Sequence, residues 1–171
     1  MPSESQYYQA SFDRLVKGIT AFITLLFGLI LFLQRNSYRL GDIPDWPLAL
    51  SGIFFISLLA VTWLMHIRGY SLLRDSLIIH RPIGNVVIKY QDIESVQSAK
   101  VEEMRWTLRT FGNGGLFGIY GKFWNNKYGH MSWYATKRSN FILINMRNGK
   151  KVVITPDDMA LVEELSSRLT M

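Results

Sequence analysis

The segment 112–123 carries the residue types that most resemble a ligand-binding motif, with closely spaced glycines followed by a lysine. A phosphate-binding P-loop needs a glycine, four residues and Gly-Lys, and then Ser or Thr. Here Gly121-Lys122 is followed by Phe123, and the residue five positions before Gly121 is not glycine. A dinucleotide-binding pattern also fails, because Phe117 occupies the place of its last glycine. The sequence therefore predicts no nucleotide site here.

An ordered aromatic loop is the better interpretation of this segment. Glycines permit positive φ angles and close backbone approach, and aromatic rings are stabilised when they leave water. The rings either pack inward onto their own domain or contact the membrane interface or a partner, and the sequence leaves both options open. The candidate interaction loop consists of Gly112, Gly114, Gly115, Phe117, Gly118, Tyr120, Gly121, Lys122, Phe123 and Trp124.

Further basic residues flank this loop along the chain and form a candidate basic rim. They are Lys100, Arg105, Arg109 and Lys127. Such a rim is either an ordinary solvated surface or a contact for anionic lipid headgroups.

No other group of residues predicts catalysis or metal binding. The chain has no cysteine, which excludes disulfides, thiolate metal sites and cysteine nucleophiles. His66, His80 and His130 are isolated in the sequence, and no pair of them has metal-ligand spacing. Adjacent carboxylates such as Glu102-Glu103 are better explained as solvated or capping residues than as an acid–base pair. We expect no catalytic residue, no cofactor, no metal and no enzymatic activity.

Two apolar runs near the start of the chain predict a transmembrane hairpin. The run Gly18–Leu33 has 16 uncharged residues, which span about 24 Å as a helix, and flanking residues extend it toward the roughly 30 Å of a bilayer core. The run Trp46–Met65 has 20 uncharged residues and spans about 30 Å. We place the spans at about 15–34 and 46–66, within a region 1–66 that precedes the second domain.

Two other interpretations of these apolar runs fit the sequence less well than transmembrane helices. A cleaved signal peptide would have a shorter apolar core and a small-residue cleavage site, whereas Gln34-Arg35-Asn36 follows the first run directly. Buried helices of a soluble protein, apolar on all sides, would need a larger surrounding core than the rest of the chain can supply.

The charge distribution predicts the orientation of the hairpin. Residues 67–171 hold fifteen Lys or Arg against nine Asp or Glu, so they carry the whole net charge of +6. A basic surface favours anionic partners, but it is also typical of the cytoplasmic side of a membrane. The flank after the second span contributes Arg68, Arg74 and Arg81. We expect a multi-pass protein of the cytoplasmic (inner) membrane, with both termini in the cytoplasm and no nucleic-acid partner.

Residues 67–171 are expected to form a mostly β domain, because short β-branched or aromatic runs alternate with turns. The pair Asn148-Gly149 is the strongest hairpin signal. About seven strands are predicted, at Tyr70–Leu73, Ser76–Arg81, Val86–Tyr90, Ser95–Val101, Ser132–Thr136, Phe141–Met146 and Lys151–Ile154.

A C-terminal helix is expected to cap this β domain. The run from Thr155 to Asp158 combines a capping threonine, a proline and acidic residues, which is typical of a helix start. Leu161, Leu165 and Leu169 then recur every four residues and give one apolar face. That face would close one end of the β core.

This order of elements resembles the bacterial pleckstrin-homology (PH) domain proteins that one or two membrane helices anchor. The glycine-rich segment 112–123 is similar to one in that family, as are Tyr134-Ala135-Thr136 and the Thr-Pro-Asp at 155–157. The resemblance covers residues 69–169 and implies a two-helix transmembrane hairpin followed by a mostly β PH-like domain. PH domains that bind phosphoinositides carry several closely spaced Lys or Arg residues in their first hairpin. Here that hairpin has Arg74 beside Asp75, followed by Arg81, so the resemblance does not imply tight phosphoinositide binding.

We therefore expect a non-enzymatic, membrane-anchored PH-like interaction module at the cytoplasmic membrane face. The leading hypothesis is protein–protein or self-association, with a protein partner or homo-oligomer in addition to the lipid bilayer. One alternative is a binding module for anionic lipid headgroups. Another is an accessory subunit of a membrane enzyme or transporter complex.

Overall fold

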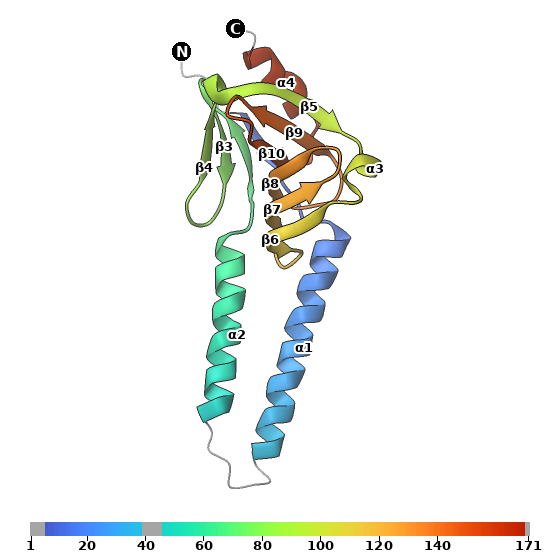
Figure 1. Ribbon diagram of the computed structural model, residues 1–171. Coiled ribbons are helices and arrows are strands. Elements are labelled where there is room, and N and C mark those ends of the chain that lie inside the picture. The colour runs from blue at the N-terminus through green and yellow to red at the C-terminus, as the bar shows by residue number, and fades with distance from the viewer. Residues whose placement is uncertain (1–5, 39–45, 170–171) are drawn as a thin grey trace.

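The computed structural model describes residues 6–38 and 46–169 of the 171-residue chain, and it consists of two long helices below a β-rich domain (Figure 1). Residues 39–45 lie between the two predicted spans and include Arg39 and Asp45; they are outside the described residues. The first described residues, 6–13, and the last helix both belong to the β-rich end of the molecule (Figure 1).

The two long helices are α1, Arg14–Tyr38, and α2, Trp46–Leu64. Both are long and apolar enough to cross a membrane, a property that signal sequences and soluble core helices can share. Few of their residues are buried within the protein, which is unlike a soluble core helix. They lie side by side, with the rings of Phe27 and Phe55 stacked at 4.0 Å between centroids.

Helix α1 begins at a side-chain cap. A carboxylate oxygen of Asp13 accepts a hydrogen bond from the backbone N–H of Val16 at 2.7 Å, which satisfies one of the free donors of the first turn. Val16 itself is buried against the β domain, so the start of α1 is fixed to that domain.

The first sheet has four antiparallel strands in the order β1-β2-β3-β4. Their bounds are Gln6–Gln9 for β1, Gly69–Leu72 for β2, Ser76–His80 for β3 and Val86–Lys89 for β4. The predicted hairpin at Arg74-Asp75 is confirmed, because β2 and β3 flank it. Strand β1 was not predicted, and it brings the chain before α1 into the same sheet as the chain after α2.

The second sheet has six strands in the order β5-β9-β10-β8-β7-β6, and only the β10–β8 pair is parallel. The bounds are Ile93–Ala99 for β5, Leu108–Gly114 for β6, Ile119–Asn125 for β7, Gly129–Ala135 for β8, Phe141–Met146 for β9 and Lys151–Ile154 for β10. A short 3-10 turn, η1 at Tyr90–Asp92, precedes β5, and the four-residue helix α3, Val101–Met104, follows it.

The predicted mostly β fold is confirmed, but the described residues hold ten strands instead of about seven. Three strands were missed. β6 and β7 arise from the glycine-rich segment, and β1 comes from the chain before the helices. That segment is therefore a β-hairpin and not the loop that the sequence suggested.

The final helix, α4 at Ala160–Leu169, caps the fold as predicted. Leu161 and Leu165 are fully buried in the core between the sheets, and Leu169 packs against it. The helix begins later than the sequence suggested, because Asp158 and not Thr155 caps it. The Asp158 carboxylate accepts the backbone N–H of Ala160 at 2.9 Å.

Candidate interaction site

The glycine-rich hairpin of β6 and β7 depends on a pair of facing glycines. Gly112 on β6 lies opposite Gly121 on β7, and both have positive φ, of 111° and 129°. A Cβ on Gly121 would lie 2.3 Å from the backbone oxygen of Phe111, and one on Gly112 would lie 2.4 Å from that of Tyr120. Only glycine allows the two backbones to approach this closely.

The turn of this hairpin, residues 115–118, is held by Asn113. The side-chain oxygen of Asn113 accepts the backbone N–H groups of Gly115 and Leu116, and its amide donates to the Leu116 carbonyl. Phe117 adopts a positive φ of 55°, which is uncommon for a residue other than glycine. Hydrogen bonds from Asn113 thus connect the two ends of the tip, and the order of the segment stays a prediction.

The hairpin tip contacts both long helices. The hydroxyl of Thr20 on α1 accepts the Phe117 N–H at 3.1 Å and donates to the Gly115 carbonyl at 3.4 Å. From the other helix, the carbonyl of Thr62 on α2 accepts the hydroxyl of Tyr120 at 3.2 Å. The tip therefore lies at the domain-side ends of the two apolar helices, one turn beyond Lys17 along α1.

The aromatic rings of the segment divide between the two options that the sequence left open. Tyr120 and Phe123 are buried, Phe123 stacking on Trp133 at 4.6 Å, whereas Phe117 and Trp124 are half-buried. Tyr120 and Phe123 pack in the cores of the domain. Phe111 on β6, by contrast, is 78% exposed.

Strand β6 is an edge strand with a large exposed apolar surface. Trp106 just before the strand is 78% exposed, Leu108 is 63% exposed and Phe111 is 78% exposed. In Figure 1, β6 is the strand of its sheet that lies nearest the two helices. Sequence reasoning did not include Trp106 and Leu108 in the site, although an alternation of Trp and Leu with polar residues at 106–109 was a signal that could have found them.

The residues of the candidate basic rim are all exposed but differ in their contacts. Lys127 forms an ion pair with Glu103 at 2.6 Å. Together with the Tyr128 hydroxyl, Lys127 holds the pKa of the Glu103 carboxyl down at about 2. Lys122 donates to the Ser132 hydroxyl at 2.7 Å.

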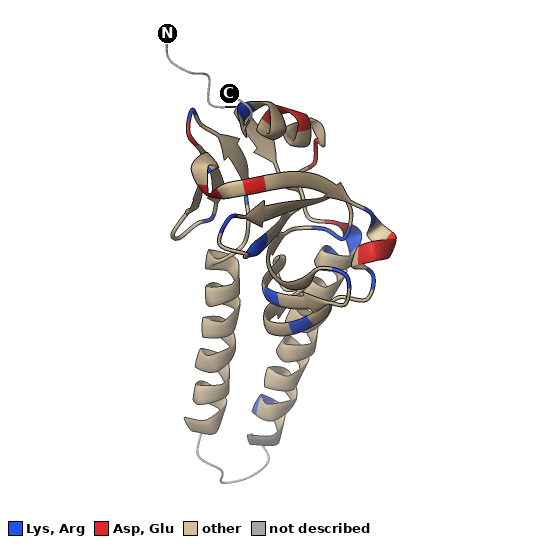
Figure 2. Cartoon of the chain, turned by 45° about the horizontal axis from the view of Figure 1, so that its top comes forward, with Lys and Arg blue, Asp and Glu red and all other residues tan. Residues whose placement is uncertain are grey.

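Arg105 and Arg109 have no acidic partner among the described residues. Figure 2 shows this distribution: basic positions occur on β6 and β7 beside α1, while the long helices carry very little charge. Lys100, between β5 and α3, likewise forms no ion pair within the described part of the chain, so the uncompensated charge of the rim lies at Lys100, Arg105 and Arg109.

The Thr-Pro-Asp motif at 155–157 joins the chain ahead of α1 to the domain. Asp157 forms an ion pair with Lys137 at 2.7 Å, and its carboxylate accepts the hydroxyl and the N–H of Ser11. The backbone N–H of Asp157 donates to the Gln9 carbonyl at 2.9 Å. These contacts and β1 fix residues 6–13 to the β-rich end.

The Tyr-Ala-Thr motif at 134–136 lies next to this joint. The buried hydroxyl of Tyr70 donates to the Tyr134 carbonyl at 2.7 Å and accepts the Thr155 N–H at 3.1 Å, while the Thr155 hydroxyl accepts the Thr136 N–H. Burial raises the pKa of the Tyr70 hydroxyl. Both motifs of the resemblance therefore act in one buried hydrogen-bond network that supports the fold.

Within the described residues, no cluster of His, Asp or Glu could hold a metal ion. The expected absence of a catalytic residue, cofactor or metal site stays a prediction. The histidines are separate here as well; His80, for example, contacts the Ser71 hydroxyl at 2.8 Å.

The fold is a β-rich, PH-like domain beside a hairpin of two long apolar helices. The domain consists of two mainly antiparallel sheets and a capping helix. Comparison with family models shows a match to the bacterial PH domain over residues 68–169, which is more than half of the chain. The chain belongs to the bacterial PH domain family. No curated protein and no solved structure matches the chain. PH domains are generally non-catalytic interaction modules, and this chain is assigned to that broad class.

Proposed function

We propose that this protein is a membrane-anchored interaction module whose β6 edge rests on the anionic surface of the bilayer. The observation that carries this proposal is the position of the exposed apolar and basic β6 edge beside the ends of α1 and α2. If these helices span the membrane, the edge lies at the level of the lipid headgroups.

The depth of the edge follows from the contacts of the hairpin tip. Thr20 of α1 binds the turn at Gly115 and Phe117, and Thr20 lies beyond Lys17, the last charged residue before the apolar part of α1. Charged residues mark the interface, where lysine side chains extend toward water. The turn is therefore expected at the boundary between headgroups and hydrocarbon.

The residue types along β6 suit the same environment. Tryptophan is favoured at the interface, phenylalanine occurs on surfaces that enter the headgroup boundary, and arginine binds anionic headgroups. Trp106 and Phe111 are both exposed, and Arg105 and Arg109 near them have no acidic partner in the part of the chain that the structure describes. Burial of such a ring in the interface stabilises the contact by up to about 1.5–3 kcal/mol.

Association with protein remains a second candidate, because one side of β6 is unpaired in its sheet. An unpaired edge can accept a strand from a second copy or from another protein. The geometry favours lipid, since the edge lies on the side of the sheet nearest the helices (Figure 1) and a partner strand would have to enter between domain and membrane. The accessory-subunit hypothesis stays a prediction.

Photo-crosslinking from β6 separates these candidates. The full chain in native membranes would carry p-benzoylphenylalanine in place of Phe111, with the same replacement at the exposed Glu163 of α4 as the control. The proposal expects lipid adducts from position 111 and none from position 163, read by mass spectrometry. Protein adducts alone at position 111 would contradict the lipid contact and support the second candidate.

A further inference from the structure

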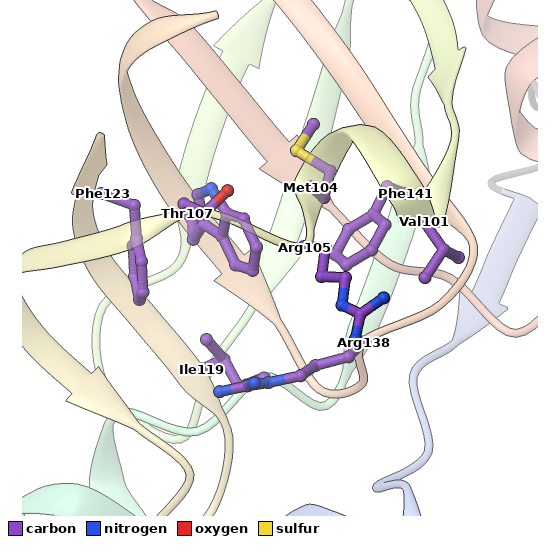
Figure 3. Close-up of a pocket in the computed structure, with 9 residues that line it drawn as sticks. Val101, Met104, Arg105, Thr107, Ile119, Phe123, Arg138 and Phe141 are labelled. Carbon is purple, nitrogen blue, oxygen red and sulfur yellow. The ribbon is translucent and has the colours of Figure 1, made fainter. Parts of the chain in front are cut away.

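A cavity of about 150 Å³ is lined by residues of α3, β7, β8 and the start of β9 and by the segment just before β6 (Figure 3). Its walls come from segments that are distant in the sequence. They are Val101, Met104, Arg105, Thr107, Ile119, Phe123, Trp133, Arg138 and Phe141.

The inner wall of the cavity is aromatic. Trp133 stacks on Phe123 at 4.6 Å and meets Phe141 at 5.3 Å in a tilted arrangement. Trp133 is only 3% exposed, and its indole N–H is buried with no acceptor among the described residues. Because this N–H is enclosed by the protein, the indole contributes its apolar ring face to the cavity.

The outer wall is basic. In Figure 3 the side chains of Arg105 and Arg138 extend across the same side of the cavity. Both residues are exposed, and neither has an acidic partner among the described residues. Arg138 is held by its backbone N–H, which donates to Asp13 at the cap of α1, so its guanidinium remains available.

We propose that this cavity binds a small anionic amphiphile, with a carboxylate or phosphate at Arg105 and Arg138 and an apolar group against Trp133. The volume limits the apolar group, because an apolar cavity of about 150 Å³ accommodates a molecule the size of benzene. Guanidinium groups hold carboxylates and phosphates through paired, charge-assisted hydrogen bonds.

Two sources supply this chemistry. The first is a soluble anion with a ring or a short branched chain. The second is an anionic membrane lipid whose headgroup and adjoining carbons enter from the bilayer surface. Arg105 is shared with the lipid contact proposed for the β6 edge, whereas Arg138 lies outside that edge, so Arg138→Gln tests the cavity separately.

The test uses the full chain in phosphatidylcholine nanodiscs with ¹⁵N-labelled tryptophan. The probe is 3-phenylpropionate, and 3-phenylpropan-1-ol and 3-phenylpropylamine are its neutral and cationic counterparts. Trp133→Phe assigns the Trp133 indole resonance. We expect 3-phenylpropionate to shift that resonance and to bind about tenfold more tightly than the alcohol, as a charge-assisted bond implies.

Matched arginine variants test the basic wall. Arg138→Gln and Arg105→Gln should each weaken binding of 3-phenylpropionate about tenfold. Arg147→Gln is the control, because Arg147 is equally exposed but does not line the cavity. Unchanged resonances of the other tryptophans would show that the variants fold.

Three results would overturn the proposal: an unmoved Trp133 resonance, equal binding of the anion and the alcohol, or equal losses for Arg138→Gln and Arg147→Gln. Phosphatidylglycerol in the nanodisc identifies the source. Displacement of 3-phenylpropionate by it supports a lipid ligand, and unchanged binding supports a soluble anion. Lipid crosslinking at Phe111 is read separately, so failure of one proposal leaves the other standing.

Discussion

Replacement of Gly121 with alanine should destabilise the β6–β7 hairpin by more than the backbone strain at this position alone would cause. Two contributions are expected. An alanine at φ 129° is strained by more than about 1 kcal/mol. Its Cβ would also lie 2.3 Å from the Phe111 oxygen and 2.8 Å from the Gly112 Cα, and such overpacking costs about 1–3 kcal/mol. The total is about 2–4 kcal/mol.

Gly149 offers a matched control. It also has a positive φ, of 78°, but a Cβ there would meet nothing within 4 Å. Gly149→Ala therefore carries the backbone contribution without the clash. The difference between the two variants reports the close approach of β6 and β7 together with the larger backbone strain at φ 129°.

Native-state amide hydrogen exchange of the full chain in nanodiscs measures both effects. The free energy of opening should fall at the β7 amides in Gly121→Ala and at the β9–β10 turn in Gly149→Ala, with the larger loss at β7. Equal losses in the two variants would refute the argument that the facing glycines are required for packing.

Three further predictions follow from the fold. Leu165→Ala empties a fully buried site under α4 and should reduce the free energy of unfolding by about 2–5 kcal/mol, measured by denaturant titration; an unmoved midpoint would contradict docking of the helix. The Glu103 carboxyl should titrate near pH 2 in ¹³C NMR, because its pKa is lowered from 4.5. The contribution of its ion pair with Lys127 to stability is therefore complete above about pH 4.5 and is lost as the pH falls through about 2. Titration of Glu103 near pH 4.5 that does not change in Lys127→Ala would disprove the ion pair. Both termini should be cytoplasmic, so a C-terminal alkaline phosphatase fusion should be inactive in cells, and an active fusion would reverse the orientation.

The sequence predicted those parts of the fold whose signals are local. β-Branched residues between turns located seven strands, and Asn148-Gly149 correctly marked the turn between β9 and β10. The leucines of α4 repeat every four residues, and this period alone placed them in the core. In each case neighbouring residues determine the structure.

Features that depend on distant contacts escaped prediction. β1 is a strand only because it pairs with β2, more than sixty residues later. The start of α4 was placed too early because Thr155 and Asp157 have the residue types of a helix start but bind Thr136 and Ser11 instead. Tertiary hydrogen bonds override the local capping signal at these positions.

The candidate site shows the same division. The sequence singled out the glycines and the basic residues as a candidate site, which stays a prediction, but it did not predict the pairing of β6 with β7, because glycine and asparagine are poor strand signals and interrupt the aromatic and β-branched residues. The ion pair of Lys127 with Glu103 and the cavity beside Trp133 join segments far apart in the chain. Such contacts depend on the folded structure and leave no local pattern.

The central claim, that the β6 edge rests on the bilayer surface, is tested most directly by paramagnetic relaxation from lipids spin-labelled in the headgroup. The full chain would be placed in nanodiscs containing phosphatidylglycerol. We predict that the amide signals of Leu108 and Phe111 broaden strongly while that of Glu163 on α4 remains sharp. Equal broadening at Phe111 and Glu163 would contradict the proposed contact.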